Sequence, residues 1–134
     1  MSMTPFLEAR VDMAKILAVD DEPLACDFLK KFLGRQGYEV SVDTTGKQAL
    51  ELIQAERPHL VLLDIRMPGM DGMEVMRRAK DIDPALGFIM VTALHDDRIG
   101  RKALSEGAYD YITKPVDIEY LKTSISMSLA NLVE

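Results

Sequence analysis

The sequence lacks several features that mark specialised classes of protein. It contains a single cysteine, Cys26, so no disulfide can form within the chain and a reducing cytoplasm is the expected setting. Its longest apolar runs, such as 16–19 and 60–63, are far shorter than the roughly 20 residues of a membrane-spanning helix. Residues 1–13 carry acidic side chains and no long apolar stretch, which is not the pattern of a signal peptide.

The chain also lacks an excess of positive charge. Lysine and arginine total 16 against 22 aspartate and glutamate residues, which gives a formal net charge of −6. Because contacts with nucleic-acid phosphates need clustered basic side chains, this balance argues against direct nucleic-acid binding by the segment. Apolar residues make up 48% and charged residues 28% of the 134 residues, a composition typical of one globular domain.

Short apolar runs alternate with amphipathic segments along most of the chain. Their pattern predicts strands at 15–19, 38–42, 59–63, 88–91 and 109–112. Apolar residues at helical spacing predict helices at 23–36, 46–56, 73–80, 96–106 and 117–132. The weakest elements are the second strand and the fourth helix, where Gly100 should cost about 1 kcal/mol relative to alanine.

This order of elements predicts an α/β fold. Apolar strands such as 60–63 do not alternate with polar residues, so we expect them to be buried on both faces. The expected architecture is a parallel sheet with helices on each side, joined by right-handed crossovers. We predict that residues 14–134 form one domain and that residues 1–13 are an N-terminal leader, native or left over from cloning.

Polar residues follow the predicted strands directly, at the edge where parallel sheets bind their ligands. They are Asp20, Asp21, Asp64, Thr92 and Lys114. A single aspartate at a strand end is more often a helix cap or a turn residue. Three acids, a hydroxyl and an ammonium at one edge have complementary chemistry, so we expect them to form a functional site.

Three carboxylates at one site repel one another unless a cation lies among them. Oxygen ligands favour a hard ion, and no soft ligand accompanies them, since Cys26 lies on the first helix and no histidine is placed with the acids. Mg²⁺ or Mn²⁺ is therefore the expected cofactor. A carboxylate can also act as a nucleophile toward phosphorus and form an acyl phosphate. Such a transfer requires the phosphoryl oxygens to be neutralised, and a metal, a lysine and a hydroxyl supply that.

These motifs resemble the receiver domain of two-component response regulators. The resemblance covers about residues 14–132 and is carried by 19–22 (VDDE), 63–72 (LDIRMPGMDG), 91–93 (VTA) and 107–115 (GAYDYITKP). It implies a flavodoxin-like (βα)5 fold, a doubly wound parallel five-stranded sheet in the order 2-1-3-4-5. It also implies a signalling phosphoacceptor that is not an enzyme, although it assists its own phosphorylation and dephosphorylation.

The resemblance implies a role for each acidic residue. Asp64 would accept the phosphoryl group from a phosphohistidine on a sensor histidine kinase or phosphotransfer protein, and Lys114 would pair with the phosphoryl oxygens. Asp21, Asp64 and the backbone carbonyl of Arg66 would ligate the metal, and Asp20 would hold a metal-bound water.

The resemblance also implies how the signal leaves the site. Thr92 would hydrogen-bond the phosphoryl group, and Tyr111 would be the aromatic switch that turns inward as Thr92 moves. The peptide bond before Pro115 would be cis. The fourth helix, the last strand and the last helix would form the surface read by an output domain, a partner or a second copy. Without the resemblance, Tyr111 is equally well a half-buried strand tyrosine.

Two neighbours of these residues are expected to tune the site. Arg66 lies two residues after Asp64, and Leu94 lies two residues after Thr92. We hypothesise that this long cation and this apolar side chain limit attack by water and so set the lifetime of the phosphorylated state. His95 follows them, and we interpret it as a histidine of a surface loop.

Three alternatives stay open at this point. A small phosphatase or phosphotransferase of the haloacid-dehalogenase type also uses an aspartyl nucleophile and Mg²⁺, but it needs an aspartate where this chain has Arg66. A flavodoxin-like flavin-binding module would want a phosphate loop rich in glycine, serine and threonine in place of residues 20–22. A degenerate receiver that serves only as an interaction scaffold is disfavoured by the intact residue set.

Overall fold

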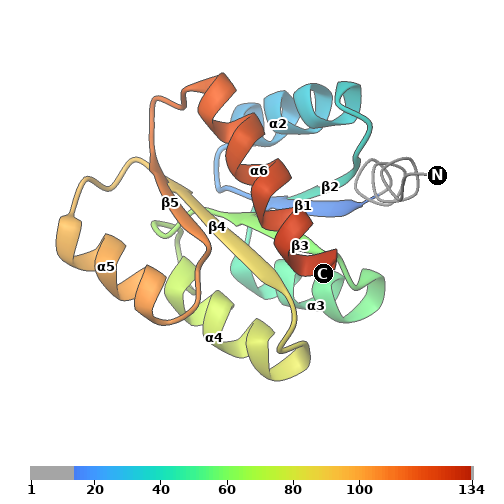
Figure 1. Cartoon of the computed structure of the whole chain (residues 1–134). Coiled ribbons are helices and arrows are strands. Elements are labelled where there is room, and N and C mark those ends of the chain that lie inside the picture. The colour runs from blue at the N-terminus through green and yellow to red at the C-terminus, as the bar shows by residue number, and fades with distance from the viewer. Residues whose placement is uncertain (1–13, 134) are drawn as a thin grey trace.

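The computed structural model describes residues 14–133, so the predicted leader 1–13 lies outside the described residues. Strands and helices alternate along this part of the chain (Figure 1). The strands are β1 (Lys15–Val19), β2 (Glu39–Asp43), β3 (Leu60–Leu63), β4 (Gly87–Thr92) and β5 (Asp110–Thr113). The helices are α2 (Pro23–Arg35), α3 (Gly46–Glu56), α4 (Gly72–Ile82), α5 (Asp97–Ser105) and α6 (Ile118–Val133). Each element lies within two residues of its predicted bounds.

The strands form one parallel sheet in the order β2-β1-β3-β4-β5, which confirms the predicted doubly wound fold. β1 and β3 are neighbours although α2, β2 and α3 separate them in the sequence. Their register pairs Val19 with Leu63, so the next residues of each strand, Asp20 and Asp64, leave the sheet side by side. The order of the strands therefore brings the predicted site residues of β1 and β3 together.

Helices cover both faces of the sheet (Figure 1). α2 and α6 pack on one face, and α3, α4 and α5 pack on the other. Side chains of β1 alternate between these two cores: Ile16 and Ala18 face α2 and α6, whereas Leu17 and Val19 belong to the other core. Because both faces are buried, the central strands are continuous apolar runs. Among the described residues, no helix is long and apolar enough to cross a membrane.

The two elements with the weakest sequence pattern are both present, for identifiable reasons. β2 lies at the edge of the sheet, and most of its side chains are only half-buried. Its sequence therefore lacks the continuous apolar run of a buried strand. α5 begins after Asp96, whose carboxylate accepts hydrogen bonds from the backbone amides of Arg98 and Ile99. Gly100 is buried in α5 beneath the ring of Tyr111. A Cβ at position 100 would lie 3.4 Å from the nearest atom of that ring. At that distance a Cβ would make an ordinary van der Waals contact, so the ring packs directly against this turn of α5.

One glycine sets how closely α4 approaches the end of β3. The backbone amide of Gly72 donates to the carbonyl of Ile65, at 2.9 Å. A Cβ at Gly72 would lie 2.3 Å from the carbonyl oxygen of Asp64 and 2.8 Å from the Cα of Ile65. Both contacts are with backbone, which cannot swing away as a side chain can. The start of α4 therefore fits against Asp64 only without a side chain at position 72.

We predict that Gly72→Ala lowers the free energy of unfolding by about 2–3 kcal/mol, because the added methyl group overpacks the loop after β3. Gly34→Ala is the matched control, since a Cβ at Gly34 in α2 meets nothing within 4 Å. That change should raise stability by roughly 0.5–1 kcal/mol through better helix propensity. Urea unfolding followed by circular dichroism measures both. Equal stabilities of the two variants would contradict the close approach at Gly72.

Candidate functional site

The predicted site residues gather at the carboxyl ends of the strands. Asp20 follows β1, Asp64 follows β3, Thr92 ends β4 and Lys114 follows β5. Asp20, Asp64 and Thr92 are buried, with exposed fractions of 3%, 5% and 0%. Asp21 lies beside them at the surface. The sheet therefore brings together residues that are up to 94 positions apart in the sequence.

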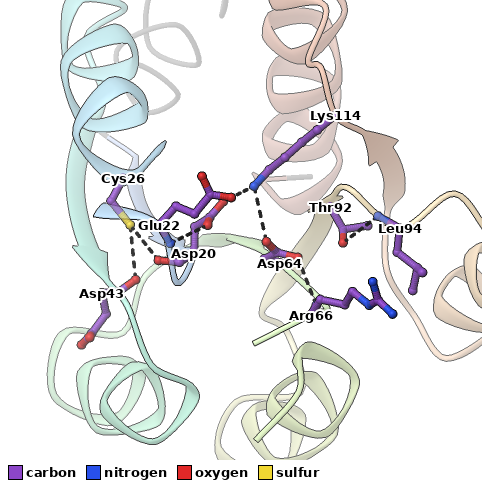
Figure 2. Close-up of polar contacts among 9 residues, drawn as sticks. All are labelled: Asp20, Glu22, Cys26, Asp43, Asp64, Arg66, Thr92, Leu94 and Lys114. Carbon is purple, nitrogen blue, oxygen red and sulfur yellow. Dashed lines mark hydrogen bonds and ion pairs between the residues drawn. The ribbon is translucent and has the colours of Figure 1, made fainter. Parts of the chain in front are cut away.

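Lys114 connects two of the carboxylates. Its ammonium donates to Asp20 at 2.5 Å and lies 3.4 Å from an oxygen of Asp64. Figure 2 shows its side chain reaching from the end of β5 to both carboxylates. Burial by itself would lower the pKa of the Lys114 ammonium, but the hydrogen bond to Asp20 and the charges of Asp20 and Asp64 outweigh it and raise the pKa. Lys114 is therefore a permanent cation at neutral pH.

Asp20 and Asp64 are oriented in the same way. One oxygen of Asp20 accepts from the backbone amide of Glu22 at 3.0 Å, and one oxygen of Asp64 accepts from the backbone amide of Arg66 at 3.1 Å. Each carboxylate thus closes a local turn with the amide two residues ahead. The second oxygen of each is left to face Lys114 (Figure 2). These turns leave one oxygen of each carboxylate directed toward the Lys114 ammonium.

The three acids are close enough to share one cation. Asp20, Asp21 and Asp64 each offer a carboxylate oxygen, and these oxygens all lie within 4.8 Å of one another. The donors are oxygens only, which suits a hard divalent ion with some water ligands. The cluster therefore has the chemistry of a metal site.

Thr92 and Tyr111 lie on the other side of the site. The hydroxyl of Thr92 accepts from the backbone amide of Leu94 at 3.3 Å (Figure 2). The hydroxyl of Tyr111 donates to the carbonyl of Leu94 at 2.5 Å. Burial and the nearby acids, Asp96 and Asp64 among them, raise the pKa of Tyr111, so it stays a neutral donor. Thr92 and Tyr111 are thereby linked through Leu94.

Cys26 has a supporting role that sequence reasoning missed. Its thiol is buried, as expected for a small apolar side chain, but it lies 3.2 Å from the carbonyl of Asp20 and 3.4 Å from that of Asp43 (Figure 2). Burial raises the pKa of this thiol, which favours the protonated donor. Cys26 therefore ties the start of the loop after β1 to the end of β2. Nothing local in the sequence indicates this contact.

The segment after β5 is held by backbone contacts. The amide of Lys114 donates to the carbonyl of Thr92 at 2.8 Å, and the peptide bond between Lys114 and Pro115 is cis. The side chain of His95 is exposed, yet its Nε2 lies 3.1 Å from the carbonyl of Lys114. His95 was predicted to lie in a surface loop, and nothing local in the sequence indicates its contact with Lys114.

Comparison with known proteins identifies the family. The profile of the response regulator receiver domain matches residues 16–126 of the chain. The chain belongs to the response regulator receiver domain family. A receiver domain protein from Methanospirillum hungatei has a similar crystal structure, with a TM-score of 0.86 and 34% sequence identity over 90% of this chain and 97% of that one.

Curated relatives of this receiver domain differ in length. Sporulation initiation phosphotransferase F of Bacillus subtilis is 36% identical over 86% of this chain and 93% of its own length. Transcriptional regulatory protein ZraR of Escherichia coli is 36% identical over 90% of this chain, which spans only 27% of that regulator. Similar receiver domains thus occur both nearly alone and as a minor part of a longer protein.

Membership in this family decides against two of the three alternatives raised by the sequence. The receiver domain is a signalling phosphoacceptor of two-component systems, and neither a phosphatase of the haloacid-dehalogenase type nor a flavin-binding module is favoured. Its acidic cluster of Asp20, Asp21 and Asp64 fits phosphorylation and metal binding.

Proposed function

We propose that Asp64 is the phosphoacceptor of this receiver domain and that a phosphohistidine on a partner protein is the donor. The observation that carries the proposal is the position of the Lys114 ammonium, 2.5 Å from Asp20 and 3.4 Å from Asp64. Asp20 and Asp64 both have one oxygen committed to a local turn and the other facing this cation. Asp64 is favoured over Asp20 because it follows β3, which adjoins β4, the strand that ends at Thr92, whereas β1 does not pair with β4.

We propose Mg²⁺ as the cofactor. Asp21, Asp64 and the backbone carbonyl of Arg66 would hold it directly, and Asp20 would hold a water bound to it; the oxygen-only donor set supports this choice over a soft metal. When bound, the ion neutralises negative charge on the acids and on the phosphoryl oxygens.

The residues of the chain perform the remaining tasks in the transfer. An oxygen of Asp64 attacks phosphorus, the bond between phosphorus and the donor imidazole nitrogen breaks, and the imidazole leaves with the electron pair. Lys114 pairs with the phosphoryl oxygens, because its long side chain and permanent charge already reach Asp64. The Thr92 hydroxyl donates to another phosphoryl oxygen. Attack of water on the same phosphorus breaks its bond to the Asp64 oxygen, which restores the carboxylate and releases phosphate.

We predict that the wild-type domain gains the mass of one phosphoryl group when it is incubated with acetyl phosphate and Mg²⁺, and that Asp64→Asn gains none. The amide removes the nucleophilic oxygen but keeps the size of the side chain. Asp81→Asn is the matched control, since Asp81 is an exposed residue of α4 and should leave uptake unchanged. Intact-protein mass spectrometry measures all three. Equal uptake by Asp64→Asn and the wild type would rule out Asp64 as the acceptor.

The lifetime of the phosphorylated state is proposed to depend on Arg66 and Leu94. Arg66 is exposed and Leu94 half-buried, and both line a shallow groove between the loops after β3 and β4. A long cation and an apolar side chain at these places would restrict the approach of water to the acyl phosphate.

Phosphorylation is proposed to act through Thr92 and Tyr111 on the surface of α5, β5 and α6. The Tyr111 ring lies over Gly100 of α5, so a movement of the ring would change the surface that α5 and β5 offer to a partner. A groove beside this ring is lined by His95, Gly100, Leu104 and Thr113. An output domain, a partner or a second copy of the chain would recognise this surface.

An apolar groove beside the site supports a protein donor. It runs between α2 and the segment after β5 and is lined by Asp20, Phe28, Leu29, Lys114, Val116 and Ile118. Phe28 is 49% exposed and stacks on Phe32, with ring centroids 5.8 Å apart. Because the groove includes Asp20 and Lys114, a helix seated in it would carry its phosphohistidine to Asp64. We therefore propose that the kinase or phosphotransfer protein docks here, in the cytoplasm.

We predict that Phe28→Glu slows phosphoryl transfer from a histidine kinase at least tenfold and leaves uptake from acetyl phosphate unchanged. The charge would disrupt docking of the apolar partner surface, whereas the small donor does not use the groove. The kinase is one from the source organism that phosphorylates the wild-type domain in vitro.

Met127→Glu is the control for this prediction, because Met127 is 57% exposed on α6 and does not line the groove. It should change neither rate. Loss of uptake from both donors in Phe28→Glu would assign Phe28 to the chemistry or to folding instead, and unchanged transfer from the kinase would place the docking surface elsewhere.

A further inference from the structure

His95 makes a contact that neither the sequence pattern nor the proposed chemistry explains. The residue lies in the loop between β4 and α5, and its exposed ring reaches the carbonyl of Lys114, with 3.1 Å between Nε2 and the oxygen. The two residues are 19 positions apart, and they lie in the segments that follow the neighbouring parallel strands β4 and β5.

The chemistry of the contact determines the state of the ring. A carbonyl oxygen only accepts hydrogen bonds, so Nε2 of His95 must carry the proton. The neutral ring with its proton on Nε2 and the doubly protonated cation both satisfy this requirement. The contact therefore does not depend on the charge of His95, only on a donor at the position of Nε2.

This donor acts on the backbone of the residue that carries the site's ammonium. The amide of Lys114 is bound to the carbonyl of Thr92, its carbonyl accepts from His95, and the next residue, Pro115, has no N–H. A lysine side chain is long and has many rotamers, so the position of its ammonium starts from the position of its backbone. His95 therefore restrains the base of the chain that ends 2.5 Å from Asp20.

A second hydrogen bond links the same two segments in the opposite direction. Tyr111 of β5 donates to the carbonyl of Leu94, and the next residue, His95, donates to the carbonyl of Lys114. Together with the amide of Lys114 bound to Thr92, these contacts join the loop after β4 to the segment after β5. Thr92 and Lys114, the two groups that would face the phosphoryl oxygens, are thus parts of one hydrogen-bonded unit.

We propose that His95 is a positioning residue, which holds the backbone of Lys114 against the loop after β4 so that the Lys114 ammonium and the Thr92 hydroxyl meet the phosphoryl group together. This inference rests on the proposed function of Asp64. Without the contact, the segment that begins at Lys114 moves independently of the loop that begins at Thr92. The ammonium then spends less time in reach of Asp64.

His95→Gln and His95→Asn test the proposal as a matched pair. The amide nitrogen of glutamine lies about as far from the backbone as Nε2 of histidine, whereas that of asparagine is one bond shorter. We expect His95→Asn to slow uptake from acetyl phosphate about three- to tenfold, a factor that corresponds to the net free energy of one hydrogen bond. His95→Gln should stay within about twofold of the wild type, and both should melt within a degree or two of it, since surface changes alter stability little.

Hydrogen exchange supplies a readout that needs no phosphoryl group. In His95→Asn the amide of Lys114, which is bound to Thr92, should exchange several-fold faster than in the wild type and in His95→Gln. Long-range proton–nitrogen NMR spectra of the wild type should show the proton of the neutral His95 ring on Nε2.

Several outcomes would overturn the proposal. Uptake and exchange in His95→Asn equal to those of the wild type would show that the contact positions nothing. Equal losses in both variants would show that the ring, and not its donor, matters, and a parallel fall in melting temperature would show a purely structural role. If the wild type took up no phosphoryl group, the proposed function of Asp64 would fail, and unaltered exchange in His95→Asn would separately overturn the restraint on Lys114.

Discussion

The site depends on one electrostatic arrangement, in which the Lys114 ammonium lies between two buried carboxylates. Asp20 and Asp64 are only 3% and 5% exposed, and charged groups buried to that extent need a partner of opposite charge. Lys114 supplies the opposite charge from the end of β5. This strand pairs with neither β1 nor β3, since β4 lies between β3 and β5. The same ammonium therefore balances the acids and connects their edge of the sheet to β5, the strand that carries Tyr111.

Backbone geometry creates this arrangement before any ligand binds. Parallel register brings Asp20 and Asp64 out of the sheet together, and each then closes a turn with the amide two residues ahead. Tight packing fixes the surroundings: Gly72 lets α4 meet the backbone of Asp64, and the thiol of Cys26 holds the carbonyl of Asp20. These contacts fix the acidic side of the site through backbone and buried groups of β1, β3 and α4.

Sequence reasoning predicted the features that depend on local pattern. Buried parallel strands are continuous apolar runs, so β1 and β3 and the acids that follow them were predictable, whereas the strand order came from the family resemblance. Contacts between distant segments were not predictable, because no local preference encodes them: Cys26 meets the carbonyl of Asp43, and His95 meets that of Lys114. Gly100 was interpreted as a weakness of its helix, and its packing against the ring of Tyr111, a residue of another element, was not predictable either.

The central claim is that Lys114 stabilises the fold through the two buried carboxylates, and a double-mutant cycle between Lys114→Met and Asp20→Asn tests it most directly. Free energies of unfolding are measured in urea with a chelator present, so that no divalent ion replaces the lysine. Lys114→Met alone should lose about 2 kcal/mol, and the double variant should regain at least about 1 kcal/mol of that, because one fewer charge is left buried without a partner. Strictly additive effects of the two substitutions would contradict the account.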